Sequence, residues 1–174
     1  MRYALVYGSL SGLVVIATIL AGLTLAERDG FFTSEWFGYL VMLVALSFIF
    51  VGVKRYRDVE HGGVIRFGRA FVMGLGIAAV AGLAYVAAWE IYLAATDYRF
   101  MDDYIAGIVR ARQEAGASAE EIARELASWE SMRESYRNPL FRIPVTFLEI
   151  FPVGLLVALV SAALLRNPRL LPAR

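Results

Sequence analysis

The sequence predicts an all-α membrane protein with four transmembrane helices and an extracytoplasmic helical hairpin between the third and fourth. Two observations support this fold class. The chain of 174 residues is 59% hydrophobic and 19% charged, with a mean hydropathy of +0.60, whereas soluble proteins carry about 25% charged residues. The charged residues also gather between long apolar stretches, as expected of a chain that crosses between lipid and water.

Four apolar stretches are long enough to cross a bilayer. A helix rises about 1.5 Å per residue, so it needs about 20 apolar residues to span about 30 Å of hydrocarbon. We predict transmembrane helices over residues 3–26, 36–53, 71–95 and 139–165. We interpret the first as a retained helix, because its apolar core is longer than that of a secretory signal. The whole chain, 1–174, is then a single integral membrane domain.

The connections between these stretches differ in their cations, and this difference predicts the orientation. Lys and Arg in short connections remain on the cytoplasmic side. Residues 27–35 hold one cation, Arg28, while the chain ends hold Arg2 and three arginines after the last span. The connection between the second and third spans holds five: Lys54, Arg55, Arg57, Arg66 and Arg69. We therefore expect both termini in the cytoplasm.

The five cations of this inner connection have two interpretations. They can be a topological signal alone. Alternatively, they are contacts to anionic lipid headgroups, since clustered cations gain about 1 kcal/mol each near such a surface. The sequence leaves both open, and all five are candidate headgroup contacts.

The polar insert, residues 96–138, reads as two amphipathic helices separated by Gly116. Ser118 and Glu121 form a capping box at the start of the second helix. Glu120 and Arg124 are an i,i+4 pair on its polar face. The apolar stripes are Met101, Tyr104, Ile105 and Ile108, then Ile122, Leu126, Trp129 and Tyr136. These stripes cover one another, lie on the outer end of the bundle, or face a partner.

Small residues recur at helical spacing in three of the spans. Helices in lipid associate by close packing at such positions. The residues are Gly8 and Gly12 in the first span, Gly74, Ala78 and Gly82 in the third, and Gly154, Ala158 and Ala162 in the fourth. They predict either one tight bundle or the faces of a homo-oligomer.

Polar residues within the third and fourth spans form the candidate intramembrane site: Glu90, Arg142, Thr146 and Glu149. A charge at membrane depth costs roughly 2.5–3.5 kcal/mol and needs a partner. We expect an ion pair between Arg142 and Glu90, which lie at similar depths. Glu149 stands between Pro144 and Pro152, which remove backbone donors. It is either part of a proton- or cation-responsive site with Glu90 or a hydrogen-bonded structural group.

The remaining chemistry is sparse. The chain has no cysteine and one histidine, His61, so we expect no disulfide, no metal site and no cofactor. It has neither a phosphate-binding glycine loop nor a hydrolase or metalloprotease motif, and we expect no enzyme activity. We expect the lipid bilayer as a partner and no nucleic acid.

Several motifs resemble a family of small bacterial membrane proteins, the domain-of-unknown-function family 4199. They are Lys54-Arg55-Tyr56-Arg57-Asp58, Gly62-Gly63, Phe67-Gly68-Arg69-Ala70-Phe71, Gly116-Ala117-Ser118, Tyr136-Arg137-Asn138-Pro139 and residues 146–154 around Glu149. The resemblance covers nearly the whole chain. It implies a multi-pass protein of the bacterial inner (cytoplasmic) membrane and brings no activity with it.

Two functions follow as hypotheses. The first is a non-enzymatic accessory, regulatory or envelope-organising protein, whose outer insert contacts an envelope protein. The second is a small proton- or cation-coupled transporter that uses Glu149 and Glu90. Four spans make a small transport unit, so this alternative requires a homo-oligomer.

Overall fold

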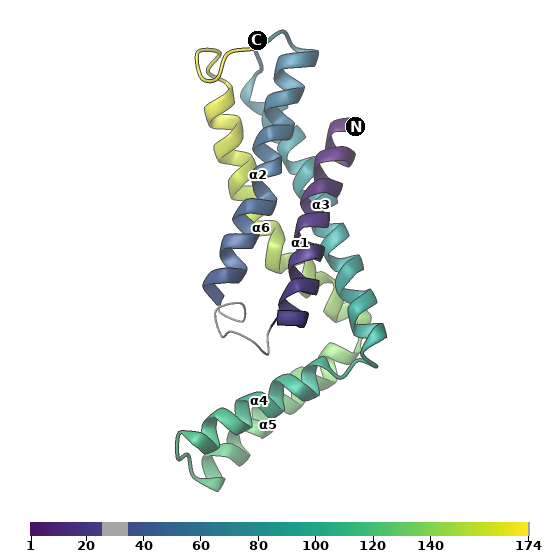
Figure 1. Ribbon diagram of the computed structural model, residues 1–174, viewed down its shortest axis with the longest axis vertical. Helices are drawn as coiled ribbons and strands as arrows, with labels where there is room; N and C mark the ends of the chain where they lie inside the picture. The colour runs from purple at the N-terminus through teal and green to yellow at the C-terminus, as the bar shows by residue number, and fades with distance from the viewer. Residues whose placement is uncertain (26–34, 174) are drawn as a thin grey trace. The chain divides into compact units, whose positions relative to one another are not determined.

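The computed structural model describes residues 1–25 and 35–173, and in these ranges the chain forms six α-helices and no strand (Figure 1). The helices are α1 (Arg2–Leu25), α2 (Glu35–Glu60), α3 (Phe67–Ala95), α4 (Phe100–Glu114), α5 (Ala119–Arg137) and α6 (Pro139–Leu165). Contacts divide the chain into two compact units. The first unit is Met1–Ala87 with Phe147–Arg174, and the second unit is Ala88–Thr146. Both α3 and α6 therefore contribute residues to each unit.

Three helices are long and apolar enough to cross a membrane: Tyr39–Glu60 in α2, the whole of α3, and the whole of α6. In α1, which has 24 residues, the described residues include the shorter apolar helix Arg2–Thr18. The end of the first predicted span and the connection that carries Arg28 lie outside the described residues. The chain is thus all-helical, with three candidate membrane-spanning helices. The prediction of a single integral membrane domain stays a prediction.

The helix that contains the second predicted span, residues 36–53, is longer than that span. The helix continues to Glu60, so Lys54, Arg55 and Arg57 lie on its last turns and not in a loop. Nothing between residues 53 and 60 interrupts a helix, because this stretch contains neither glycine nor proline.

Two glycines end this helix. Gly62 and Gly63 have φ angles of 58° and 87°, in a region that glycine occupies without steric cost. The backbone N–H of Gly63 donates to the carbonyl oxygen of Arg57 at 3.1 Å, which closes the last turn. The inner connection is therefore short, and α3 begins at Phe67, four residues before the predicted 71.

Within the first unit, the helices approach each other at small residues. A Cβ atom built on Gly12 of α1 would lie 2.5 Å from the Cβ of Ala84 in α3, and one built on Gly74 of α3 would lie 2.9 Å from the Cβ of Ala158 in α6. No side chain fits at such separations, so only glycine permits these contacts. The predicted small-residue grooves lie between helices of one chain, which favours the tight-bundle alternative.

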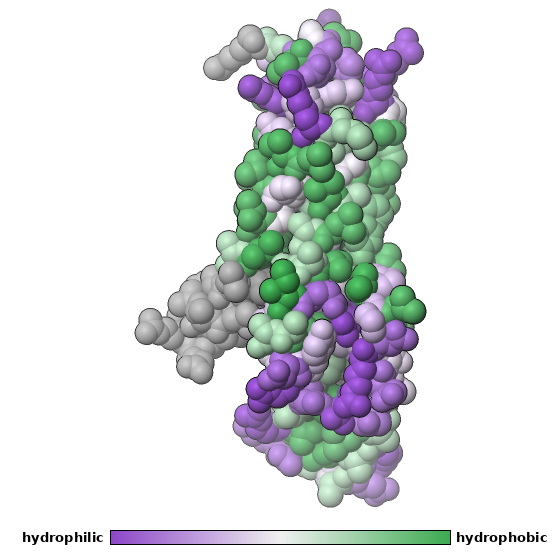
Figure 2. Space-filling model, turned by 90° about the vertical axis from the view of Figure 1, so that its right-hand side faces the viewer, coloured by the Kyte–Doolittle hydropathy of each residue, from purple (hydrophilic) through white to green (hydrophobic). Residues whose placement is uncertain are grey.

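The surface of this unit separates into apolar and polar parts. Hydrophobic side chains cover the helices, and hydrophilic ones gather around the end where α2 is joined to α3 and where the C-terminus lies (Figure 2). The core between the helices is apolar and includes Leu46, Ile49 and Ile77, each less than 2% exposed. A helix with apolar residues on its outer and inner faces is typical of a membrane span.

Within the second unit, α4 and α5 lie side by side (Figure 1). Their contact is lined by apolar side chains from both helices: Ile105, Ile108, Val109, Ile122, Leu126 and Trp129. The rings of Tyr104 and Trp129 meet edge to face, with centroids 5.6 Å apart. The two helices thus cover part of each other's apolar stripes, while Tyr104 and Leu126 remain 49% and 39% exposed.

The predicted local signals at the ends of these helices are confirmed. Gly116 has a φ of 78° after α4. Ser118 and Glu121 form the capping box of α5. Glu120 and Arg124 form an exposed ion pair at 3.7 Å.

Candidate functional site

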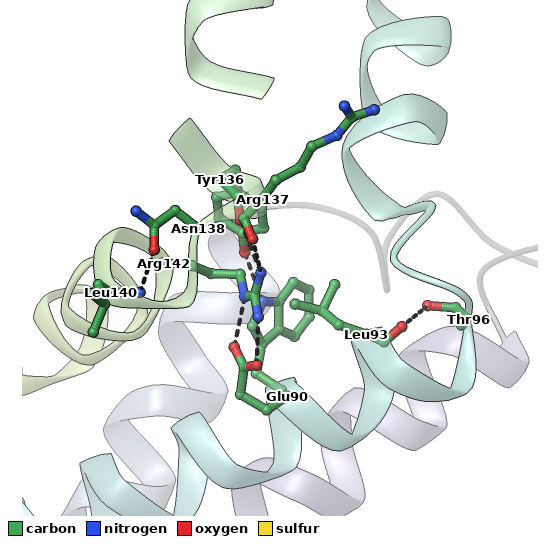
Figure 3. Close-up of polar contacts among 9 residues, drawn as sticks. Glu90, Leu93, Thr96, Tyr136, Arg137, Asn138, Leu140 and Arg142 are labelled. Carbon is green, nitrogen blue, oxygen red and sulfur yellow. Dashed lines mark hydrogen bonds and ion pairs between the residues drawn. The ribbon is translucent and has the colours of Figure 1, made fainter. Parts of the chain in front are cut away.

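The guanidinium of Arg142 and the carboxylate of Glu90 form a two-pronged ion pair in the second unit. The Nε atom of Arg142 donates to Oε1 of Glu90 at 2.7 Å, and its Nη2 atom donates to Oε2 at 2.6 Å (Figure 3). The Arg142 residue is 3% exposed, and the Glu90 side chain is 24% exposed. This geometry is the strongest that arginine offers a carboxylate. The predicted pairing of these two residues is confirmed.

Another nitrogen of the Arg142 guanidinium donates hydrogen bonds to the C-terminal end of α5. Its Nη1 atom donates to the carbonyl oxygens of Tyr136 at 2.9 Å and Arg137 at 3.3 Å (Figure 3). Carbonyl oxygens at a helix C-terminus lack partners within the helix. Arg142 therefore neutralises a carboxylate from α3 and caps α5 at once.

Aromatic rings surround this guanidinium. Its carbon atom lies 5.2 Å from the ring centroid of Tyr98 and 5.9 Å from that of Tyr136. Tyr98 and its neighbour Asp97 have φ angles of 56° and 52°, a left-handed conformation that is uncommon for residues other than glycine. The Tyr98 N–H donates to the carbonyl oxygen of Leu93 at 2.8 Å. The reversal after α3 thus brings an aromatic ring onto Arg142.

A second ion pair lies in the same unit, between α5 and α4. The Nε atom of Arg133 lies 2.6 Å from an Asp102 carboxylate oxygen, and its Nη1 atom lies 3.6 Å from Glu130. The Asp102 carboxylate raises the pKa of Arg133. A hollow of about 140 Å³ is lined by both arginines of these pairs and by Tyr98. Both arginines that line this hollow are already bound to a carboxylate.

Thr146 is 1% exposed, and its hydroxyl has no hydrogen-bond partner among the described residues. It belongs to the second unit with Glu90 and Arg142. No hydrogen bond joins it to either charge within the described residues, and its predicted supporting role stays a prediction.

Glu149 belongs to the first unit, and its side chain is exposed. The hydroxyl of Tyr85 in α3 donates to its Oε2 atom at 3.0 Å. Each carboxylate thus has a partner in its own unit, and the predicted joint site of Glu90 and Glu149 stays a prediction. Sequence reasoning missed Tyr85, since a tyrosine in an apolar span carries no distinguishing signal.

The inner cations fall into two groups. Lys54 and Arg57 are both bound to Asp58, at 2.5 Å and 2.7 Å. Arg55, Arg66 and Arg69 are exposed, and Arg55 makes no hydrogen bond or ion pair within the described part of the chain.

The prediction that Arg57 contacts lipid headgroups is wrong, because its side chain is 0% exposed. Its guanidinium lies beneath the C-terminal segment and donates to the carbonyl oxygens of Leu170 at 3.0 Å and Leu171 at 2.5 Å. No sequence signal marks this role, since its partners follow more than a hundred residues later.

In the described ranges, no group of three or more His, Asp or Glu side chains is arranged to hold a metal ion. The polar groups that the structure brings together are ion pairs and helix caps.

A family model described as "Protein of unknown function (DUF4199)" matches residues 2–167. The chain belongs to this family. The match includes all six helices and every candidate site residue. Neither a curated protein nor a solved structure matches the chain. Membership of the DUF4199 family therefore brings no activity with it.

Proposed function

We propose that this DUF4199 protein is a four-span protein of the bacterial inner membrane that acts without catalysis, as an accessory or regulatory protein. In this proposal both termini are cytoplasmic, and the α4–α5 pair lies outside and contacts an envelope protein. The length and apolar character of α1 support its role as the fourth span. The cations around the α2–α3 connection and the chain ends support the orientation.

The observation that carries this proposal is that most charges of the second unit, including the buried and half-buried ones, are already paired with each other. Arg142 holds Glu90, Arg133 holds Asp102, and Arg112 of α4 holds Glu125 of α5 at 2.9 Å. General acid–base catalysis needs a group with an open position next to a substrate. Internally paired charges instead stabilise one rigid shape, which suits recognition of another protein.

The chemistry of the partner follows from the surface of the pair. Residues 96–138 carry nine acids and six arginines, a net charge of −3. Amphipathic helices that bind anionic membranes are rich in Lys and Arg, so the bilayer surface is disfavoured. We propose a basic patch on an envelope protein as the partner.

Two experiments test this function. A periplasm-dependent reporter enzyme fused after Gly116 should be active, and the same enzyme fused after Asn167 should be inactive. A photo-crosslinking residue at Met132 or Tyr104, which are 42% and 49% exposed, should trap the same envelope protein in intact cells. The same group at Leu156, on an apolar face of α6, is the control. Trapping only lipid or only a second copy of the chain at both positions would contradict the accessory role.

A second candidate function is favoured by one observation. Glu149 is a carboxylate on a candidate span that is exposed in the single chain and holds one hydrogen bond, from Tyr85. Such a group in lipid requires further cover from protein or water. A proton- or cation-coupled transporter would supply it at an interface between copies of the chain.

This alternative predicts a flux. In proteoliposomes, Glu149→Gln should abolish proton- or cation-dependent flux, and Glu134→Gln on the exposed face of α5 should not change it. Absence of any flux with the unmodified protein would rule the alternative out and leave Glu149 as a structural group.

A further inference from the structure

Two surface hollows lie on either side of Arg55, at the C-terminal end of α2. The smaller, of about 240 Å³, is lined by Arg2, Tyr3, Val6 and Tyr7 of α1 together with Arg55. The larger, of about 640 Å³, is lined by residues of α2 and the C-terminal segment, including Lys54 and Asp58.

The two hollows differ in how many donors they leave available. In the larger one, Lys54 is bound to Asp58 at 2.5 Å, and the Asp58 carboxylate would repel an anion. Arg55 lines both hollows, is exposed, and makes no hydrogen bond or ion pair within the described residues. The smaller hollow adds the guanidinium of Arg2 and has no carboxylate among its lining residues. The smaller hollow is therefore the better anion site.

Arg2 supplies a second set of donors to the smaller hollow. Its Nη2 atom is bound to Glu60 at 2.9 Å and to the Tyr3 hydroxyl at 3.3 Å. Its Nε and Nη1 atoms make no hydrogen bond to the described part of the chain, and the side chain is 74% exposed. Glu60 fixes one edge of this guanidinium, and the other edge remains open.

The wall of the hollow changes from polar to apolar along α1. Arg2 and Tyr3 stand at the end of the helix, and Val6, which is exposed, follows about one turn further in. Tyrosine is enriched at the boundary between headgroups and hydrocarbon. This order matches a phospholipid, in which a charged phosphate precedes the acyl chains.

We propose that the hollow between α1 and α2 binds the phosphodiester of an anionic phospholipid, with the phosphate on Arg55 and Arg2 and the adjoining acyl chain against Val6. Arginine suits this role because its planar donors match two phosphate oxygens at once. The proposal rests on the proposed membrane topology. It separates Arg55 from Lys54 and Arg57, which are held by Asp58, and from Arg66 and Arg69, which do not line the hollow.

The test is native mass spectrometry of the full chain in detergent, titrated with phosphatidylglycerol, with phosphatidylcholine, or with soluble glycerol phosphate. We expect one phosphatidylglycerol to bind, and Arg55→Gln and Arg2→Gln to weaken it about tenfold each. Arg69→Gln and Lys54→Gln are matched controls, because each removes one cation from the same end of the protein, and they should leave binding nearly unchanged.

Three outcomes would overturn the site. If Arg69→Gln weakened phosphatidylglycerol binding as much as Arg55→Gln, the lipid would be attracted by the overall positive charge and not by this hollow. Equal affinity for phosphatidylcholine would remove the need for net negative charge. Equal affinity for glycerol phosphate would make a free phosphate the ligand. Because Arg2 also holds Glu60, Arg2→Gln can destabilise the fold, so its melting temperature is measured as well. Arg55→Glu changes an unpaired position and should abolish phosphatidylglycerol binding without changing the melting temperature. A chain that purified without detergent would instead contradict the proposed function.

Discussion

Two buried arginines in this protein satisfy carbonyl oxygens at the ends of helices or turns. Arg142 binds the carbonyls of Tyr136 and Arg137, and Arg57 binds those of Leu170 and Leu171. Each also holds a carboxylate, of Glu90 and Asp58 respectively. A planar guanidinium presents donors on several edges, so it can hold an acid and carbonyls together. Lysine, with a single charged centre, cannot replace it.

At the residue scale, Glu90→Gln should lower the free energy of unfolding by about 3 kcal/mol, because it leaves the buried charge of Arg142 without its partner. Unfolding of the purified protein in detergent measures this effect. Arg124→Gln, which breaks the exposed pair with Glu120, should cost less than about 0.5 kcal/mol. Similar losses in the two variants would mean that the Glu90–Arg142 pair is open to solvent.

At the scale of elements, the helix boundaries follow from local chemistry. The Ser118 backbone N–H donates to the Glu121 carboxylate at 2.8 Å, while the Ser118 hydroxyl accepts from the Glu121 N–H at 3.3 Å. Pro139 begins α6, where its missing N–H is not needed. The Asn138 side chain accepts from the Leu140 N–H at 3.0 Å and caps the same helix.

The capping box predicts a pH dependence of α5. The hydrogen bond from Ser118 lowers the pKa of Glu121 below its ordinary value of 4.5. A carboxyl whose pKa is lower in the folded state stabilises the fold above its unfolded pKa, and this stabilisation is lost as the pH falls through the folded pKa.

We therefore expect helicity, measured by circular dichroism of the purified protein, to be constant from pH 7 to about 5. It should decrease once the pH is lower than the ordinary pKa of a glutamate. In Glu121→Gln this part of the acid transition should be absent. Ser118→Ala should cost about 1 kcal/mol at pH 7. An unchanged acid transition in Glu121→Gln would assign it to other carboxyls.

The contacts between helices predict opposite effects of one substitution at two glycines. Gly12→Ala should destabilise the protein by about 1–3 kcal/mol, because the new Cβ would lie 2.5 Å from that of Ala84. Gly107→Ala in α4 meets nothing within 4 Å and should stabilise α4 by about 0.8 kcal/mol through helix propensity. Thermal unfolding in detergent measures both, and equal signs would contradict the packing of α1 on α3.

At the scale of the whole molecule, distant parts of the chain are tied together at the end of the first unit. Arg57 and Leu171 are 114 residues apart in sequence, and Tyr3 donates to Glu60 across 57 residues at 2.9 Å. These ties hold the C-terminal segment and the start of α1 against α2. The cation-rich end of the unit is thus ordered by buried and half-buried contacts.

Removing the buried cation should release the C-terminal segment. Arg57→Met leaves the carbonyls of Leu170 and Leu171 and the Asp58 carboxylate without a donor, which should cost about 2–3 kcal/mol. Limited proteolysis should then cleave after Arg169 faster than in the unmodified protein. Arg55→Met removes an exposed neighbour as the control and should leave the cleavage rate unchanged. Equal rates in all three proteins would show that the segment is held without Arg57.

The sequence by itself determined the features that depend on neighbours within a few residues or on composition. The all-helical class, three of the apolar spans, the glycine stop at Gly116 and the Ser118–Glu121 box are such features, and the structure agrees with them in the residues it describes. The pairing of Glu90 with Arg142 was also predictable, because a charge in an apolar span requires an opposite charge at similar depth and few were available.

Only the tertiary structure decided which side chains face each other across helices. Sequence reasoning placed Arg57 in a loop with the headgroup contacts and did not mark Tyr85, whereas the fold buries Arg57 and brings the Tyr85 hydroxyl within 3.0 Å of the Glu149 carboxylate. The physical reason is that the rotation of a helix about its axis is set by all its packing contacts together. In spans that are apolar on every face, no local pattern marks the side that turns inward.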